Sequence, residues 1–230
     1  MARAVRTPRQ IAMHNRAIAP LFNAIEEDDV DAAMAALESG IISVNARQIV
    51  DGGYMENATS LHQVKSAEMA RFLVGAGADL EARDERDFTP LHTLVCSENA
   101  DAVQALIDAG ADIHARENQK SGMTPLHLAA GNGFTEVGIA LLEAGADPLM
   151  RIDNGADPDK FNQEGATCID YAEAASDDKL VQAMHLAVAN RQAKQLESAW
   201  SPSSADAEAL MPRATHNEHD APVMQKSRRL

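Results

Sequence analysis

Short apolar stretches of helical length recur along this chain, and polar markers at both ends separate one stretch from the next. A Thr-x-Leu-His phrase stands before the stretches, and a Gly-Ala-Asp triplet stands after them. The phrase occupies residues 59–62, 89–92 and 124–127, and the triplet occupies residues 77–79, 110–112 and 145–147. A pattern that returns in this way predicts a row of similar helical units.

The markers have physical reasons to begin and end helices. Threonine at a helix N-cap accepts hydrogen bonds from backbone donors that the first turn leaves without partners. Proline at the next position has a φ suited to the helix and lacks an N–H that would go unused there. Thr89-Pro90 and Thr124-Pro125 are therefore predicted to begin helices. Gly110 is predicted to follow the end of one, because the C′ residue often needs a left-handed backbone.

The phrase and its spacing resemble those of the ankyrin-repeat family, which has a Thr-Pro-Leu-His-x-Ala signature and a period of about 33 residues. Asp79 and Asp112 are 33 residues apart, and Asp112 and Asp147 are 35 apart. The resemblance implies an all-α ankyrin-repeat solenoid of about five helix–turn–helix repeats with β-hairpin-like loops. Each helix pair has an apolar face that it cannot bury alone, so the repeats must stack.

We expect three segments along the chain. A basic N-terminal arm covers residues 1–19, the repeat domain covers 20–190, and a C-terminal helical extension with a disordered tail covers 191–230. Within the domain, the five repeats are expected near residues 20–40, 59–80, 88–113, 123–148 and 166–188.

Three repeats depart from the best pattern, and terminal repeats are expected to do so. In the first, Pro20 is expected to begin a short helix, and the residues before it either fray or form an extra helix. The second is three residues shorter than its neighbours, which predicts a trimmed turn near Lys65 and Ser66. In the fifth, Cys168 takes the place of proline and Asp170 that of histidine.

Two connections, residues 41–58 and 148–166, are longer than the period requires. Insertions between repeats map to loops on one face, which is often the binding face. Residues 153–159 are rich in oxygen ligands, but they lack the Gly and Glu positions of an EF-hand loop. A slipped duplication of the repeat end is a simpler interpretation than a calcium site.

Charge is uneven along the chain, whose formal net charge is −15. Residues 1–20 carry four Arg and no acidic residue, whereas residues 21–190 carry 30 acidic and 10 basic residues. The acidic charge of residues 21–190 would repel nucleic-acid phosphates and would steer this domain toward a neutral or basic protein. Solubility alone is an equally weighted explanation of the charge. Aromatic residues make up 3% of the chain, which also disfavours base stacking.

Two cysteines, Cys96 and Cys168, are too few for a disulfide framework. A reducing compartment is the best fit, so we expect a cytoplasmic protein. The sequence contains no stretch of the length and apolar character of a membrane span.

Three histidines, His62, His92 and His127, return once in each of three repeats. Successive repeats lie roughly 10 Å apart, too far for two rings to share one zinc at about 2 Å each. The family resemblance implies instead that this histidine is structural and bonds the loop backbone and the signature threonine. We expect no metal, no cofactor and no catalytic residue, because no nucleophile, phosphate-loop or metalloprotease motif is present.

Candidate partner-binding residues follow from the resemblance, which implies a concave surface made of loop tips and the exposed ends of inner helices. Tyr, Phe, Met and Arg at such places are the types that anchor interfaces. The candidates are Tyr54, Met55, Glu56, Glu85, Arg86, Phe88, Ser97, Lys120, Ser121, Met123 and Asn132, with Cys96 beside Ser97. Phe88 and Met123 occupy equivalent positions, and anchoring a partner or padding the loop explains them equally well.

The sequence thus predicts a monomeric, non-catalytic module that binds a protein. Two narrower functions stay open. One is an effector or inhibitor that blocks a host or defence protein, and the other is an accessory subunit that docks a single enzyme.

Overall fold

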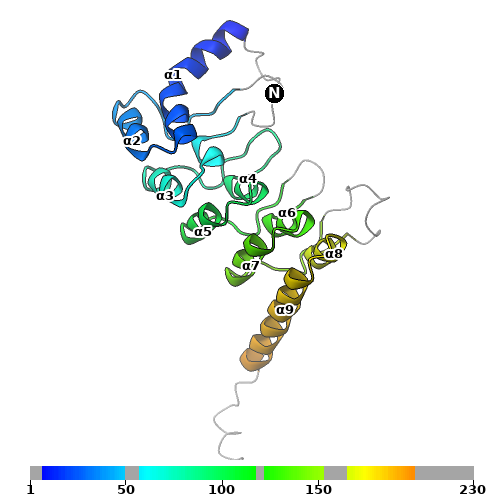
Figure 1. Cartoon of the computed structure of the whole chain (residues 1–230). Coiled ribbons are helices and arrows are strands. Elements are labelled where there is room, and N and C mark those ends of the chain that lie inside the picture. The colour runs from blue at the N-terminus through cyan, green and yellow to red at the C-terminus, as the bar shows by residue number, and fades with distance from the viewer. Residues whose placement is uncertain (1–6, 50–56, 118–121, 153–164, 200–230) are drawn as a thin grey trace, which may run out of the picture. The chain divides into compact units, whose positions relative to one another are not determined.

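The computed structural model describes residues 7–49, 57–117, 122–152 and 165–199. The chain divides into two compact parts, residues 1–190 and 191–230, and the fold described here is that of the first. Of the second part, the structure describes residues 191–199, which form the last turns of a helix. The described residues contain helices and two isolated β-bridges (Figure 1), so the expected all-α fold is confirmed.

The helices come in pairs along the chain. Their bounds are α1 Pro8–Glu27, α2 Val30–Glu38, the 3₁₀ turn η1 Ser60–Gln63, α3 Ala67–Gly75, α4 Pro90–Cys96, α5 Ala100–Asp108, α6 Pro125–Asn132, α7 Thr135–Glu143, α8 Cys168–Ala174 and α9 Asp178–Ala199. The first members of the pairs, α1, η1, α4, α6 and α8, contact one another in sequence, and α2, α3, α5 and α7 form a second row. We call the first members inner helices and the second members outer helices.

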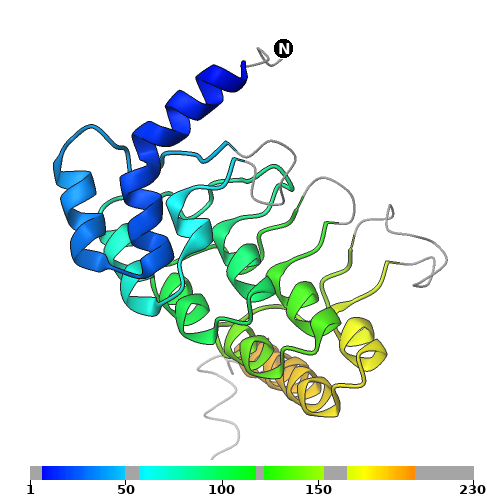
Figure 2. The same ribbon diagram turned by 45° about the horizontal axis from the view of Figure 1, so that its top comes forward.

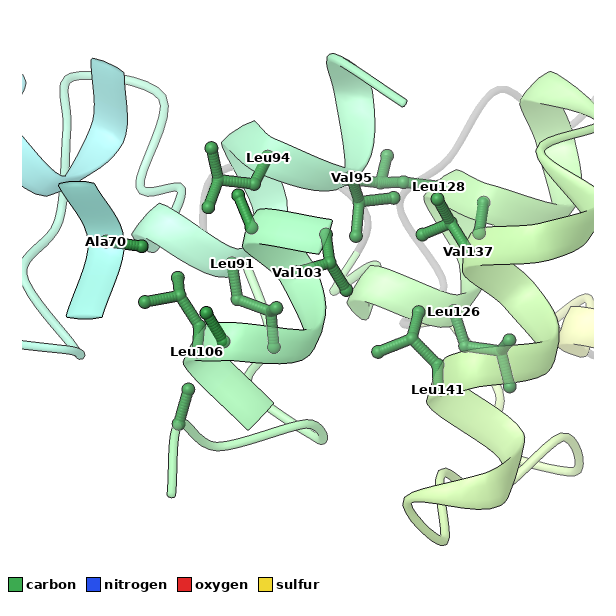
Figure 3. Close-up of a cluster of buried hydrophobic side chains, with 14 of the residues drawn as sticks. Ala70, Leu91, Leu94, Val95, Val103, Leu106, Leu126, Leu128, Val137 and Leu141 are labelled. Carbon is green, nitrogen blue, oxygen red and sulfur yellow. The ribbon is translucent and has the colours of Figure 1, made fainter. Parts of the chain in front are cut away.

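The core lies between these two rows and continues from repeat to repeat. Leu91 of α4 and Leu106 of α5 are fully buried, and Leu126 of α6 and Leu141 of α7 repeat them 35 residues later. Figure 3 shows these side chains in one apolar cluster that also contains Val103 and Val137. Burial of each leucine contributes about 1.5–3 kcal/mol. The stack is therefore stabilised by contacts that no single repeat could make alone.

The predicted helix starts at Pro90 and Pro125 are confirmed. Thr89 and Thr124 have extended backbones and form capping boxes with the third residue of their helices. Cys168, which replaces proline, also follows a capping threonine, Thr167, with a capping box to Asp170. The threonine is therefore enough to begin the helix without the proline.

The first helix corrects one prediction. It begins at Pro8 rather than Pro20, because Thr7 and Gln10 form a capping box twelve residues upstream of the expected start. Pro20 lies inside the helix, where it removes one N–H from the hydrogen-bond ladder. Proline is tolerated there on the exposed side, while Ile18 and Leu21 continue the buried side past it.

The second repeat corrects the prediction that only the turn near Lys65 and Ser66 is trimmed. The three missing residues shorten the inner helix itself, which becomes the single 3₁₀ turn η1, and not only the turn that follows it. The outer helix α3 then begins normally after Ser66, whose side chain accepts a hydrogen bond from the Met69 N–H. Leu61 of η1 remains fully buried, so the core contact survives the shortening.

Candidate partner-binding surface

Four connections lead into η1, α4, α6 and α8, and each is closed at its base by a backbone hydrogen bond. The N–H groups of Gln48, Asp84, Glu117 and Ile152 donate to the carbonyls of Ala58, Phe88, Met123 and Ala166 at 2.9, 3.0, 3.1 and 3.1 Å. The residue before each acceptor is left-handed, with φ between 61 and 76° at Asn57, Asp87, Gly122 and Gly165. The described parts of the connections lie along one edge of the helix rows (Figure 2). These are the hairpin-like loops that the resemblance implied.

In the connections before η1, α4 and α6, an arginine that was not singled out from the sequence joins one loop to the next. Arg83 Nη1 donates to the Asp87 carbonyl of its own loop at 2.8 Å and to the Arg116 carbonyl of the next loop at 2.7 Å. Equivalent bonds run from Arg47 to the Arg83 carbonyl and from Arg116 to the Arg151 carbonyl. We call the donors Arg47, Arg83 and Arg116 the arginine series. Arg83, Arg116 and also Arg151 each follow the Asp of Gly-Ala-Asp by four positions, a signal that was present in the sequence.

A second set of side chains links the same loops at their other end. The backbone N–H groups of Asp79, Asp112 and Asp147 donate to Asn45, Glu81 and His114 of the preceding loop, at 2.8, 2.8 and 3.2 Å. The residue type changes from amide to carboxylate to imidazole, but an acceptor is kept at each position. Since a backbone N–H needs only an acceptor, the partner residue can vary. The aspartate itself recurs because its carboxylate accepts from the N–H two residues later, at 3.0, 2.9 and 3.0 Å for Asp79, Asp112 and Asp147.

The three repeated histidines are structural, as the resemblance implied. Nδ1 of His92 accepts from the Thr89 N–H at 3.3 Å and lies 2.8 Å from the Thr89 hydroxyl. The proton must then be on Nε2, which donates to the Met123 carbonyl of the next loop at 3.2 Å. His62 makes the same contacts to Thr59 and to the Phe88 carbonyl. His62 and His92 therefore each cap their own helix and tie the next loop to it.

Burial lowers the pKa of these rings. Loss of hydration lowers the pKa of His62 and takes the pKa values of His92 and His127 to about 4. His127 differs from the other two, since its Nε2 has hydrogen-bond geometry with none of the described groups, although the Ala166 carbonyl is near enough to affect its pKa. All three rings are neutral at pH 7, which suits a structural role.

The tip of the loop before α4 is ordered by its own side chains. The buried Asp84 carboxylate accepts from the backbone N–H groups of Arg86 and Phe88, both at 2.8 Å. The Arg86 guanidinium lies over the Phe88 ring, 4.4 Å from its centroid, and its Nε is 3.3 Å from Asp84. Asn57 of the preceding loop donates to Glu85 at 2.7 Å. Three candidate residues are therefore held in place before any partner arrives.

Phe88 and Met123 are both half-buried and pack against the core. The Phe88 ring also stacks on His92, with centroids 5.3 Å apart. Padding is thus part of the role of both side chains, and a partner could reach only their outer portions.

The ends of the inner helices supply the most accessible candidates. Ser97 follows α4 and Asn132 ends α6, and both are exposed, as is Cys96. The next residues, Glu98 and Gly133, are left-handed with φ of 54 and 71°, so both turns have the same backbone form. Tyr54, Met55, Glu56, Lys120 and Ser121 lie outside the described residues, as do residues 153–159 and the tail from residue 200.

No group of three or more His, Cys, Asp or Glu side chains within the described ranges could hold a metal ion. None of the helices in that part of the chain is both long enough and apolar enough to cross a membrane.

Comparison with known proteins agrees with this geometry. Residues 55–152 match the family model described as ankyrin repeats (3 copies). The chain is 35% identical over 107 residues to the nuclear factor NF-kappa-B p105 subunit of Gallus gallus, which covers 45% of this chain and 11% of that protein. It is 29% identical over 121 residues to the human SMC5-SMC6 complex localization factor protein 1, covering 51% of this chain and 11% of that protein. The chain therefore spans about a tenth of the length of these relatives.

Proposed function

Residues 55–152 of this chain belong to the ankyrin-repeat family, and from this premise we propose that the protein is a non-catalytic module that binds a partner protein. The contact surface consists of the loop tips and the exposed inner-helix ends, with Arg86, Phe88, Ser97, Met123 and Asn132 at its centre. Glu85, Tyr54, Met55, Glu56, Lys120 and Ser121 belong to the same proposed surface.

The observation that carries this proposal is the contrast between a fixed frame and varied tips. Thr, His and Arg return in successive repeats, where Thr and His bond each other and His and Arg donate to loop carbonyls. The positions around Arg86 and Ser97, in contrast, change from repeat to repeat. A frame that is already ordered loses little conformational entropy when it binds, so more of the contact energy appears as affinity.

Charge supports a neutral or basic partner surface. The turns between inner and outer helices carry exposed acids in most repeats, namely Glu27, Asp28, Asp29, Glu98, Asp101, Glu136, Glu173 and Asp178. Lys65 and Lys179 are the exposed lysines near them among the described residues. Such a distribution accelerates encounter with a basic protein and weakens as salt is added.

The test begins with affinity purification of the full chain from its native cells and mass spectrometry of what is retained. The double substitution Ser97→Arg/Asn132→Arg should then reduce binding of the purified partner about tenfold or more, because two long charged side chains would occupy the contact. Gln182→Arg on α9 is the matched control, since it adds an exposed arginine far along the chain from both sites. Equal affinity of the double variant and the wild type would contradict the proposed surface.

The identity of the retained protein separates the narrower functions. Stoichiometric recovery of one enzyme supports an accessory subunit, and recovery of a host or defence protein supports an effector. We propose a cytoplasmic location, since Cys96 and Cys168 are both free thiols.

A further inference from the structure

The first repeat exposes more large apolar side chains than any other described repeat. Met13 of α1 is 67% exposed, Met34 of α2 is 42% exposed, and Ile41 after α2 is 82% exposed. Together they make up half of the six most exposed large hydrophobic residues among those described. Of the three, Met13 lies on α1, whereas Met34 and Ile41 lie on α2 and in the connection after it.

On α1, Met13 belongs to a stripe of exposed positions that extends from the first turn to the last and is interrupted at Ala24. At about 100° per residue, Arg9, Met13, Arg16, Ala17, Pro20 and Glu27 fall within roughly one third of the helix circumference. All six are exposed, but Ala24, which falls in the same sector, is buried in the core, as are Ile18, Leu21, Phe22 and Ile25 on the opposite side. We call the six residues the α1 stripe. Its centre, Ala17 and Pro20, has short side chains that permit close approach of another helix.

The charges of the α1 stripe are ordered in the direction that an isolated helix disfavours. Cationic Arg9 lies in the first turn and anionic Glu27 is the last residue, although the helix dipole favours anions at the start and cations at the end. Neither side chain forms an ion pair with any other residue in the described ranges. The Lys65 ammonium donates to the Glu26 carbonyl and places one cation at the end of the helix, but Arg9 in the first turn has no such counterpart in the described fold.

A second copy of the same helix would compensate for this order of charges. If two α1 helices pack antiparallel about a two-fold axis near residue 18, Arg9 of each copy faces Glu27 of the other, and Ala17 and Pro20 meet at the centre. The two charges lie about 27 Å apart along the helix, so both pairs can form at once. A two-fold contact repeats each pair, which doubles the effect of every charge.

We propose that the α1 stripe is a homotypic contact through which two copies of this chain associate in antiparallel fashion. This association departs from the monomer expected from the sequence. Of the residues of the α1 stripe, Glu27 alone also belongs to the inner-helix ends proposed to bind a partner.

The experiment is sedimentation velocity on the full-length protein, from about 5 to 200 μM, at low and at physiological salt. The wild type should show a concentration-dependent dimer that weakens as salt is added. Arg9→Glu and Glu27→Arg should each weaken association about tenfold, because each substitution turns two attractions into two repulsions. Both place charges that the helix dipole favours, so neither should unfold α1, and circular dichroism checks this.

An equimolar mixture of the Arg9→Glu and Glu27→Arg proteins is the decisive sample. In a mixed pair, both cross-helix contacts join opposite charges again, so the dimer should return to wild-type strength. Arg71→Glu, on an exposed position of α3, is the matched control and should dimerise like the wild type. A wild type that stays monomeric at 200 μM, or a mixture no stronger than either variant alone, would overturn the proposal. If the α1 stripe instead binds a different protein, the purified wild type will stay monomeric at 200 μM.

Discussion

In the second and third repeats one histidine both caps the inner helix and binds the next loop, and the fifth repeat shows a cap without the second role. His62 and His92 accept from a threonine through Nδ1 and donate to the next loop through Nε2. In the fifth repeat, Asp170 accepts from the Thr167 N–H and hydroxyl at 2.7 and 2.8 Å. A carboxylate can cap the helix in this way, but it has no proton with which to tie a following loop.

The histidines predict a loss of stability in mild acid. The pKa of His92 is about 4 in the folded protein and about 6.5 in the unfolded chain, so the unfolded state binds the proton more tightly. The contribution is complete above pH 6.5 and is lost as the pH falls toward 4. It amounts to at most about 3 kcal/mol for a ring this deeply buried. Urea unfolding at pH 7.0, 5.5 and 4.5 should show the free energy of unfolding falling steadily.

Removal of the ring gives the corresponding control. His92→Gln should lower stability at pH 7 and flatten the dependence on pH, whereas His185→Gln removes an exposed imidazole on α9. An unfolding free energy that stays constant between pH 7.0 and 4.5 would show that the buried rings do not control acid stability.

At the scale of the element, the Thr-Pro pairs at residues 89–90 and 124–125 correctly predicted helix starts. Pro20 misled because a proline marks a helix start only when a capping residue precedes it, and Ala19 cannot cap. Thr7-Pro8 carried the true signal. The 3₁₀ turn of the second repeat was beyond prediction, because three missing residues could shorten either the helix or the turn, and packing decided between them.

The candidate surface was predictable only in part for a related reason. The exposed ends at Ser97 and Asn132 follow from the repeat register alone. The half-burial of Phe88 depends on a stacking partner, His92, and on the position of the next repeat. The arginine series was visible as a spacing, but its role depends on which carbonyls come within reach in three dimensions.

The outer helices predict a contrast between two glycines. A Cβ at Gly138 of α7 would lie 2.7 Å from a Leu180 methyl group of α9, whereas a Cβ at Gly75 of α3 would meet no atom within 4 Å. Gly138→Ala should therefore destabilise the protein by about 1–3 kcal/mol through overpacking. Gly75→Ala should be neutral or stabilise it by up to about 1 kcal/mol, because alanine is the better helix former.

Thermal unfolding followed by circular dichroism measures both variants. Equal melting temperatures would mean that α7 and α9 are less closely packed than the structure shows.

At the scale of the whole repeat domain, cohesion comes from two kinds of contact that run through successive repeats. The apolar core joins helix pairs, and the arginine series joins loops. Since every repeat contacts only its neighbours, stability is close to a sum of repeat and joint contributions. Weakening the contact between two neighbouring repeats should therefore lower the free energy of unfolding measurably without disrupting the contacts between the other repeats.

Arg83 offers a test of the contact between two neighbouring loops. Arg83→Met keeps much of the aliphatic stem but removes the bonds to the Asp87 and Arg116 carbonyls. The free energy of unfolding in urea should fall by about 1–2 kcal/mol, at 0.5–1.5 kcal/mol for each hydrogen bond. Arg71→Met removes an exposed arginine of α3 and should change stability by less than about 0.5 kcal/mol. If both variants are equally stable, the loops are not joined by these guanidinium groups.

The loop bases have a consequence for protein engineering. The same backbone bond closes a span of three residues between Asp84 and Phe88 and a span of thirteen between Ile152 and Ala166. Arg151 adds a bond from its guanidinium to the carbonyl of Gly165, the last residue of the longer span, at 3.0 Å. Since closure is independent of the length enclosed, and longer loops cost little additional entropy, the span after Ile152 is a natural graft site. An epitope, a fluorescent tag or a second recognition peptide could be displayed there while the scaffold keeps its fold.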